Sequence, residues 1–260
     1  MTNIADPPER LEVLAITGLP EISAGAPLAE LLSVAMARCG LAFEDGDVLV
    51  LAQKIVSKSE GRLVELSSVE PSPFARSLAA SLAKDARQVE VVLRESKRIV
   101  RMDAGLILAE THHGFICANA GVDTSNVPHG WVSLLPVDPD ASACRLQQEI
   151  ERTSGKRVAI IVSDTFGRPW REGLTNVAIG VAGLQPLLDY RGQVDGGGHS
   201  LSATVIAAAD ELAAAAEIVM GKLSHRPAAI IRHFRWRPEP GKASAKATEM
   251  IRSREKDLFR

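Results

Sequence analysis

The chain has 260 residues, of which 46% are hydrophobic, and 32 acidic and 30 basic residues leave a formal net charge of −2. This length and hydrophobic content are sufficient for one large domain, or two small ones, with a sizeable core. The sequence has no strongly basic block, so we do not expect nucleic acid or an anionic membrane as a partner. The default partner is a small molecule.

Targeting signals are missing from the sequence. The N-terminal segment MTNIADPPER has neither the basic start nor the apolar run of a signal peptide, and we expect residues 1–10 to be flexible. The most apolar long stretch, Ala203–Met220, contains three acidic residues, which indicates a buried helix rather than a membrane span. The three cysteines are widely spaced without a CxxC pair, as in the reducing cytosol. We therefore expect a cytoplasmic protein without membrane contact.

The first predicted element is an amphipathic helix over Pro27–Arg38, with leucines at helical spacing. The apolar, β-branched run Val48–Ala52 follows a DGD turn and predicts a buried strand, with Arg62–Leu66 as its neighbour. The segment QKIVSKSEG between these two runs is interpreted as a strand-end segment. It carries Gln53, Lys54 and Lys58.

A long helical pattern covers Pro73–Ser96, with a break near Asp85. Three short apolar runs follow, separated by glycine or polar pairs, and they predict an antiparallel meander. These runs are Arg98–Met102, Gly105–Ala109 and Gly114–Ala118.

In the second half of the chain, Asp140 is expected to cap a helix that runs through Ile150. Further buried strands are expected around the alanine-rich helix, at Arg157–Ser163, Asn176–Gly183 and Pro227–Phe234. This mixture predicts an α/β or mixed α+β fold. The charged, proline-bearing segment 235–260 is expected to be a tail that lies along the surface.

Two polar turns carry the strongest chemical signal. CANAGVDTSN (Cys117–Asn126) places Asp123 after one apolar run, and IIVSDTFGRPWR (Ile160–Arg171) places Asp164 and Thr165 after another. A single Asp after a strand is most often a turn former. Two such turns, with Arg168 and Arg171 nearby, instead favour a shared divalent-cation site and metal-assisted phosphate chemistry.

Other familiar signatures are missing or weak. There is no GxxxxGK[ST] motif, and the glycine run 196–198 does not complete GxGxxG, so it is more typical of a flexible turn. No GxSxG motif supports a covalent nucleophile. The adjacent His112 and His113, if they lie on a strand, point to opposite faces; we expect one packed and one exposed, and no shared metal.

Six motifs in unbroken order resemble the coenzyme F-420-0:L-glutamate ligase family. They are GLPEI (Gly18–Ile22), DGDVLVLAQKIVSKSEGR (Asp45–Arg62), CANAGVDTSN, LLPVDPDASA (Leu134–Ala143), SDTFGRPWREG (Ser163–Gly173) and AIGVAG (Ala178–Gly183). The resemblance spans 11–234, which we expect to form the catalytic region. The ending EKDLFR resembles the bacterial branch, in its single-domain form without a fused FMN-binding domain.

The resemblance implies a GTP-dependent ligase that adds L-glutamate to coenzyme F-420-0 and builds the γ-linked oligoglutamate tail of F-420. It also implies a two-lobed fold with mixed sheets and an interlocked, butterfly-like homodimer. Mn2+ or Mg2+, in two ions, and K+ are the implied cofactors.

Residue by residue, the resemblance places metal ligands at Asp123 and Asp164 for one ion and at Thr165 for the second. The implied GTP contacts are Leu19, Pro20, Glu21, Ile22, Gln53, Lys54, Lys58, Asn126, Met220, Gly221, Lys222, Leu223, Ser224, His225 and Arg226.

Lys222 departs from the family pattern, because archaeal members have an acidic or amide metal ligand at the matching place and an ammonium cannot ligate a cation. Either the second ion is held in another way, or Lys222 contacts phosphate directly. Arg168 and Arg171 are the candidate catalytic residues. They grip either the cofactor's phosphodiester or the glutamate carboxylates, and the sequence does not choose between these roles.

Two rival functions remain at this stage. A metal-dependent phosphohydrolase would use the same two aspartates with water as the nucleophile. A degenerate, non-catalytic relative would bind nucleotide or cofactor without turnover, and Lys222 is the feature that favours it.

Overall fold

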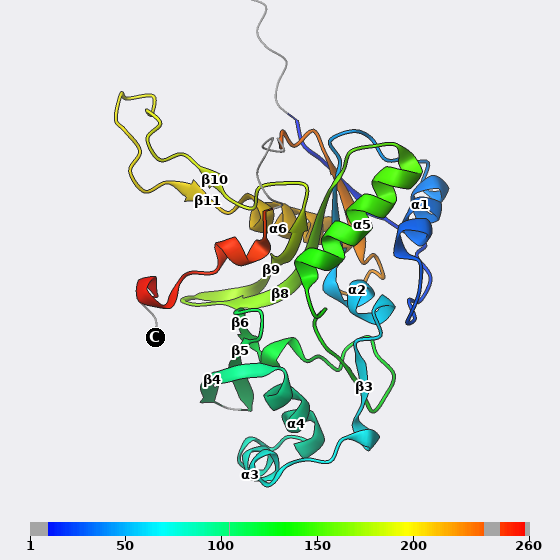
Figure 1. The fold of residues 1–260 in the computed structure, drawn as a ribbon, viewed down its shortest axis with the longest axis vertical. Coiled ribbons are helices and arrows are strands. Elements are labelled where there is room, and N and C mark those ends of the chain that lie inside the picture. Colours follow the sequence, from blue (N-terminus) through cyan, green and yellow to red (C-terminus); the bar gives the residue numbers. More distant parts are fainter. Residues whose placement is uncertain (1–9, 104, 237–244, 258–260) are drawn as a thin grey trace, which may run out of the picture.

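The computed structural model describes residues 10–103, 105–236 and 245–257. It has a mixed α/β architecture with four sheets, which confirms the expected fold class. Figure 1 shows a larger upper part built on a five-stranded sheet and a smaller lower part built on a meander and two helices. The expected flexible segment 1–10 lies outside the described residues except for Arg10.

The five-stranded sheet forms the centre of the larger part. Its middle strand, β2, pairs in parallel with β8, and all other neighbours in this sheet are antiparallel. The strand order is β1 (Glu12–Ile16), β12 (Ala228–Arg232), β2 (Val48–Ala52), β8 (Ala159–Arg168) and β9 (Arg171–Ala182).

Both faces of this sheet are covered, which explains why its strands are almost continuously apolar. Leu49 and Leu51 of β2 point into a core shared with α1 (Leu28–Arg38) and α5 (Pro139–Ser154). Val48 and Val50 point into a second core against α6 (Ala208–Met220), because successive strand side chains alternate between faces.

The smaller part has its own core, which contains Leu78, Val92 and Ile107. Its elements are α3 (Pro73–Leu82), α4 (Ala86–Arg94) and the antiparallel strands β4 (Ser96–Asp103), β5 (Leu106–Thr111) and β6 (Ile116–Ala118). The meander and the break near Asp85 are both confirmed. Asp85 caps α4 by accepting a hydrogen bond from the Arg87 backbone N–H at 2.8 Å.

Two smaller sheets complete the structure. β3 (Leu63–Glu65) pairs with β7 (Trp131–Ser133), and β10 (Leu188–Asp189) pairs with β11 (Val205–Ile206) at the base of a loop that projects from the body (Figure 1). The glycine run 196–198 lies in this exposed loop. No helix among the described residues is long and apolar enough to cross a membrane.

The structure corrects two expectations around β2. Arg62–Leu66 is not a neighbour of this strand, because β12 and β8 already occupy both of its edges and β3 pairs with β7 instead. The segment after β2 is a helix, α2 (Gln53–Ser59), rather than an extended strand end. Its seven residues are too few for a helical period to stand out in the sequence.

Asp140 is not the cap of α5. Asp138 caps this helix, with Oδ1 accepting from the Ala141 backbone N–H at 2.9 Å. Asp140 instead accepts from the backbone N–H of Val181 at 2.8 Å and of Ala247 at 2.9 Å. Its carboxylate therefore joins β9 to the C-terminal segment, a tertiary role that the local pattern D-P-D could not reveal.

The tail is also more integrated than expected. Ala247 is fully buried and Met250, in the same short 3-10 helix (Ala247–Met250), packs against the core beneath α6. Trp236 donates its indole N–H to the carbonyl of Gly46 at 2.8 Å. The described parts of the tail thus pack on the body, while 237–244 lie outside the described residues.

The two adjacent histidines lie in the turn between β5 and β6, not on a strand. His112 is exposed, and His113 is half-buried with its ring 5.8 Å from that of Phe115. One is packed and one exposed, as expected.

Candidate functional site

The parallel pairing of β2 and β8 brings the two chemical motifs of the sequence together. Ala52, the last residue of β2, lies beside Ser163 of β8, so the residues that follow each of them lie close together. The loop before β12 reaches the same edge of the sheet, because the Ala52 backbone N–H donates to Pro227 O at 2.8 Å. Carboxyl ends of parallel strands are a frequent location for ligand sites.

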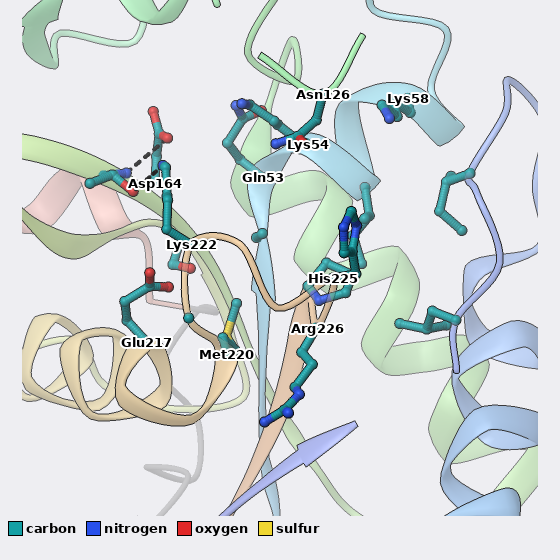
Figure 2. A pocket seen from close by; sticks show the side chains of 18 of the residues that line it. Gln53, Lys54, Lys58, Asn126, Asp164, Glu217, Met220, Lys222, His225 and Arg226 are labelled. Atoms are coloured by element: carbon teal, nitrogen blue, oxygen red, sulfur yellow. Dashed lines mark hydrogen bonds between the residues drawn. The ribbon is translucent and has the colours of Figure 1, made fainter. Parts of the chain in front are cut away.

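A cavity of about 350 Å³ opens at this edge. Every residue for which a GTP contact was expected lines it, except Ser224. Figure 2 shows Lys54 and Lys58 from α2 on one side of the cavity, and Glu217 and Lys222, from α6 and its following loop, on the other.

Helix α2 presents two lysines to the cavity because Lys54 and Lys58 are four residues apart on one helical face. Lys58 is almost fully buried and forms an ion pair with Glu21. Lys54 Nζ lies 2.6 Å from Asp123 Oδ2 and also donates to the carbonyl of Ser125 at 3.1 Å. Ile55 and Val56 of the same helix pack into the core, which holds the lysines in place.

Asp123 is both a turn former and an ion-pair partner in the structure. As a turn former, it accepts from the Ser125 backbone N–H at 2.8 Å and from the Ser125 hydroxyl at 3.0 Å. As an ion-pair partner, it faces Lys54. Burial acts to raise the pKa of Asp123, but Lys54 and Ser125 together hold this pKa below its ordinary value. The carboxylate is therefore charged at neutral pH.

Asp164 lies within β8, not after it, because this strand continues to Arg168. A register irregularity between Val162 and Ser163 immediately precedes it. Burial, with a smaller contribution from the charge of Asp123, raises the pKa of Asp164 to about 6, although the hydrogen bond from the Thr165 backbone N–H acts to lower it. The two carboxylates are thus close enough to repel each other.

A polar chain that the sequence analysis missed runs across the cavity wall. The Thr165 hydroxyl donates to Asn176 Oδ1 at 2.8 Å, and Asn176 Nδ2 donates to Glu217 Oε2 at 3.0 Å. Lys222 Nζ donates to Thr165 Oγ1 at 3.4 Å. Asn176 and Glu217 both line the cavity.

One sequence signal could have revealed Asn176. If the GRPW segment is read as a β-hairpin turn, β9 folds back on β8 and Asn176 lies opposite Thr165, as the structure shows. Glu217 has no such signal, because its approach depends on how α6 packs against β9.

Arg168 and Arg171, the expected catalytic residues, do not line the cavity. They face each other at the tip of the β8–β9 hairpin, where both are exposed. Arg168 donates to the backbone carbonyl of Gly173 at 3.3 Å, and also to that of Glu172. Their catalytic assignment stays a prediction.

The described residues contain no group of three or more His, Cys, Asp or Glu side chains that could hold a metal by themselves. Of the three expected metal ligands, Asp164 and Thr165 line the cavity, whereas Asp123 does not line it and lies beside it on Lys54. Their carboxylate and hydroxyl oxygens nevertheless fit a hard divalent cation. The raised pKa of Asp164 is a second indication, because a buried carboxylate that also has Asp123 nearby creates a local need for positive charge. Lys54 supplies part of that charge.

The fold and this cavity define an α/β protein with a polar ligand site at the edge of a mixed sheet, where lysines and carboxylates face each other. The family model for F420-0:gamma-glutamyl ligase matches residues 17–233. The chain belongs to this family of ligase enzymes, as the resemblance of its motifs indicated.

Curated relatives match over nearly their whole length. The coenzyme F420:L-glutamate ligase of Methanothermobacter thermautotrophicus is 43% identical over 251 residues, covering 96% of this chain and 99% of that protein. The enzyme of the same name from Methanopyrus kandleri is 44% identical over 254 residues, with the same coverage. That of Archaeoglobus fulgidus is 40% identical over 252 residues, covering 96% of this chain and 97% of the relative.

Proposed function

We propose that this enzyme joins L-glutamate to coenzyme F-420-0 in the cytoplasm, with GTP as the energy source, and extends the γ-linked oligoglutamate tail of F-420. Family membership supports the ligase reaction. The observation that carries the proposal is the cavity itself, which Lys54, Lys58 and Lys222 line together with Asp164, while Asp123 lies beside it in an ion pair with Lys54. Such a site suits a nucleoside triphosphate and its bound cation, because the lysines face the phosphates and the carboxylates face the cation.

Amide formation from a carboxylate needs activation, because oxide is a very poor leaving group. In the proposed reaction, a carboxylate oxygen of F-420-0 attacks the γ-phosphorus of GTP, the bond to the β-phosphate oxygen breaks, and GDP leaves. The glutamate amine then attacks the carbonyl carbon of the acyl phosphate. The amide bond forms, phosphate leaves, and the amine loses a proton.

The chain's own residues provide positioning and charge. Lys54 and Lys58 spread the negative charge of the transferring phosphoryl group, and α2 holds them rigidly through its buried face. Lys222 contacts phosphate directly, which is the alternative that its 3.4 Å contact with Thr165 favours. The segment Leu19–Ile22 and the loop 220–226 form the remaining nucleotide walls.

Asp123, Asp164 and Thr165 would hold Mn2+ or Mg2+, which supplies Lewis-acid stabilisation of the triphosphate when bound. Asn176 orients the Thr165 hydroxyl through its amide oxygen, and Glu217 fixes Asn176 in turn. The proposal also includes a second divalent ion at Thr165 and an assisting K+, both of which are implied by the family resemblance.

Two further parts of the proposal concern the exposed β8–β9 hairpin. Arg168 and Arg171 contact the phosphodiester of the cofactor or the carboxylates of glutamate as these substrates approach. Trp170 and Leu174, on the same hairpin, are 83% and 68% exposed, and a second copy of the chain would cover them in an interlocked homodimer.

The test is mass spectrometry of F-420-0 incubated with the purified protein, GTP, L-glutamate, Mn2+ and K+, beside reactions that lack each component. Successive glutamyl mass additions that depend on GTP are expected. Phosphate release without glutamylation would favour the phosphohydrolase, and nucleotide binding without turnover would favour the degenerate binder.

A further inference from the structure

A second cavity, of about 300 Å³, shares no lining residue with the cavity at the sheet edge, which we call the nucleotide cavity after its proposed ligand. We call the second cavity the basic pocket. It lies between strands β4 and β5 of the smaller part and the C-terminal segment. Its lining includes Lys97, Arg98, Glu110, Ile251, Arg252 and Arg254.

A β-bulge brings two adjacent cations to the same side of this pocket. Neighbouring strand residues normally point to opposite faces, but the pairing of β4 with β5 shifts between Ser96 and Arg98. As a result, Lys97 Nζ lies 3.4 Å and Arg98 Nε 2.6 Å from the two carboxylate oxygens of Glu110. One acidic group is therefore shared by two basic ones.

One buried donor and two exposed arginines at the pocket lack a protein acceptor among the described residues. Arg252 and Arg254 are exposed, and neither forms an ion pair or a side-chain hydrogen bond with any residue that the structure describes. Arg98 Nη2 is buried without a hydrogen-bond partner in the described chain. Buried polar groups are almost always paired in native proteins, so a donor of this kind marks a place where an acceptor is expected.

The charge balance identifies the class of ligand. Among the described lining residues, four are cationic and one is a carboxylate, which gives this part of the pocket an excess of three positive charges. Arginine presents a planar fork that matches carboxylate and phosphate oxygens. The C-terminal segment closes the pocket through Ile251, whose Cδ1 would lie 3.3 Å from a Cβ at Gly114.

Neighbouring residues connect the basic pocket to strand β8, which contributes Asp164 and Thr165 to the nucleotide cavity. Gly114 lines the basic pocket, and the next residue, Phe115, packs edge-on against Phe166 with ring centroids 6.2 Å apart. Phe166 follows Thr165 in β8. The residues that follow Gly114 of one cavity and Thr165 of the other thus form one aromatic pair.

We propose that the basic pocket is a second ligand site, which binds a small polyanion carrying two or three carboxylate or phosphate groups. The acidic tail of a glutamylated product and a free inorganic phosphate compound share this chemistry. The first of these sources rests on the proposed function, whereas the site itself does not.

The test compares binding of two probes by isothermal titration calorimetry at low ionic strength, without divalent cation. The probes are tri-γ-glutamate and inorganic pyrophosphate. The double variant Arg252→Gln/Arg254→Gln removes two unpaired cations from the pocket. The matched control, Arg76→Gln/Arg101→Gln, removes the same charge from exposed arginines of the smaller part outside the pocket.

We expect the pocket variant to bind at least one probe about tenfold more weakly than the wild type, and the control to bind like the wild type. The probe with the larger loss identifies the source of the ligand. Equal affinity in wild type and pocket variant, or no binding of either probe to the wild type, overturns the proposal. A wild type that glutamylates F-420-0 without binding a probe overturns only this site, and probe binding without glutamylation overturns only the proposed function.

Discussion

Lys54 Nζ lies 2.6 Å from Asp123 Oδ2, and this ion pair joins the helix that follows β2 to the turn that follows β6. Each partner was singled out separately in the sequence, one as a phosphate contact and one as a metal ligand. Their contact shows that the two motifs lie side by side in the fold. It also shows that Asp123 already has a positive neighbour before any ligand arrives.

Replacing Lys54 with glutamine tests this arrangement. Removing one preorganised cation from a phosphoryl-transfer site is expected to lower kcat for GTP-dependent glutamylation about 100-fold, because the charge that develops in the transition state loses a fixed partner. The measurement is steady-state product formation by mass spectrometry. Lys156→Gln is the control, since this lysine is half exposed and lies 3.9 Å from Asp45, outside the cavity. A Lys54 variant within threefold of wild type would contradict the role.

Glu217→Gln tests the polar chain Thr165–Asn176–Glu217. Loss of the carboxylate weakens the hold on Asn176 and removes a negative charge from the cavity wall, so Mn2+ affinity is expected to fall about 10-fold. Electron paramagnetic resonance titration of free Mn2+ measures this affinity without turnover. Glu211→Gln, at an exposed position of the same helix, should bind Mn2+ like the wild type. Identical Mn2+ affinities in all three proteins would contradict a role for Glu217 in cation binding.

Asp164 predicts a defined pH dependence of stability. Its pKa is raised from 3.8 to about 6, so between these values the folded chain binds more protons at this group than the unfolded chain does. The free energy of unfolding contributed by Asp164 therefore falls as pH rises through that window. Asp164→Asn lacks this dependence, and urea denaturation without divalent cation should show its stability relative to wild type increasing from about pH 4 to pH 7.

Divalent cation provides the complementary measurement on the same two proteins. At pH 7, Mn2+ is expected to raise the Tm of the wild type more than that of Asp164→Asn, because only the wild type retains both carboxylates. Parallel pH curves and equal Mn2+ effects would be inconsistent with a buried, cation-binding Asp164.

The two hydrogen bonds that Asp140 accepts predict that two substitutions at this position lower the free energy of unfolding by different amounts. Asp140→Ala removes the acceptor for the backbone N–H groups of Val181 and Ala247, and is expected to lower the free energy of unfolding by about 2–4 kcal/mol. Asp140→Asn retains Oδ1 as an acceptor and is expected to cost under about 1 kcal/mol. Chemical denaturation measures both, with Glu149→Ala at an exposed position of α5 as the control. Equal losses in the two Asp140 variants would contradict the tie between β9 and the C-terminal segment.

Local patterns in the sequence were enough to predict several elements. α1, the meander and the broken helix around Asp85 were identified correctly, since each depends on short-range periodicity and capping. α2 was missed because a helix of seven residues spans too few turns to display its period. Asp140 was misread because a cap and a long-range acceptor have the same local sequence.

The sequence by itself determined the residue types of the site and the family. Asp123, Asp164 and Lys54 stood out because polar groups interrupt apolar runs at those points, and the ordered motifs carried the resemblance that the family match confirmed. Only the tertiary structure decided which of these residues meet. The parallel pairing of β2 with β8, the approach of Glu217 to Asn176, and the convergence of Arg98 with Arg252 and Arg254 all join segments far apart in the chain. Such contacts arise from strand pairing and core packing, which depend on the whole fold rather than on neighbouring residues.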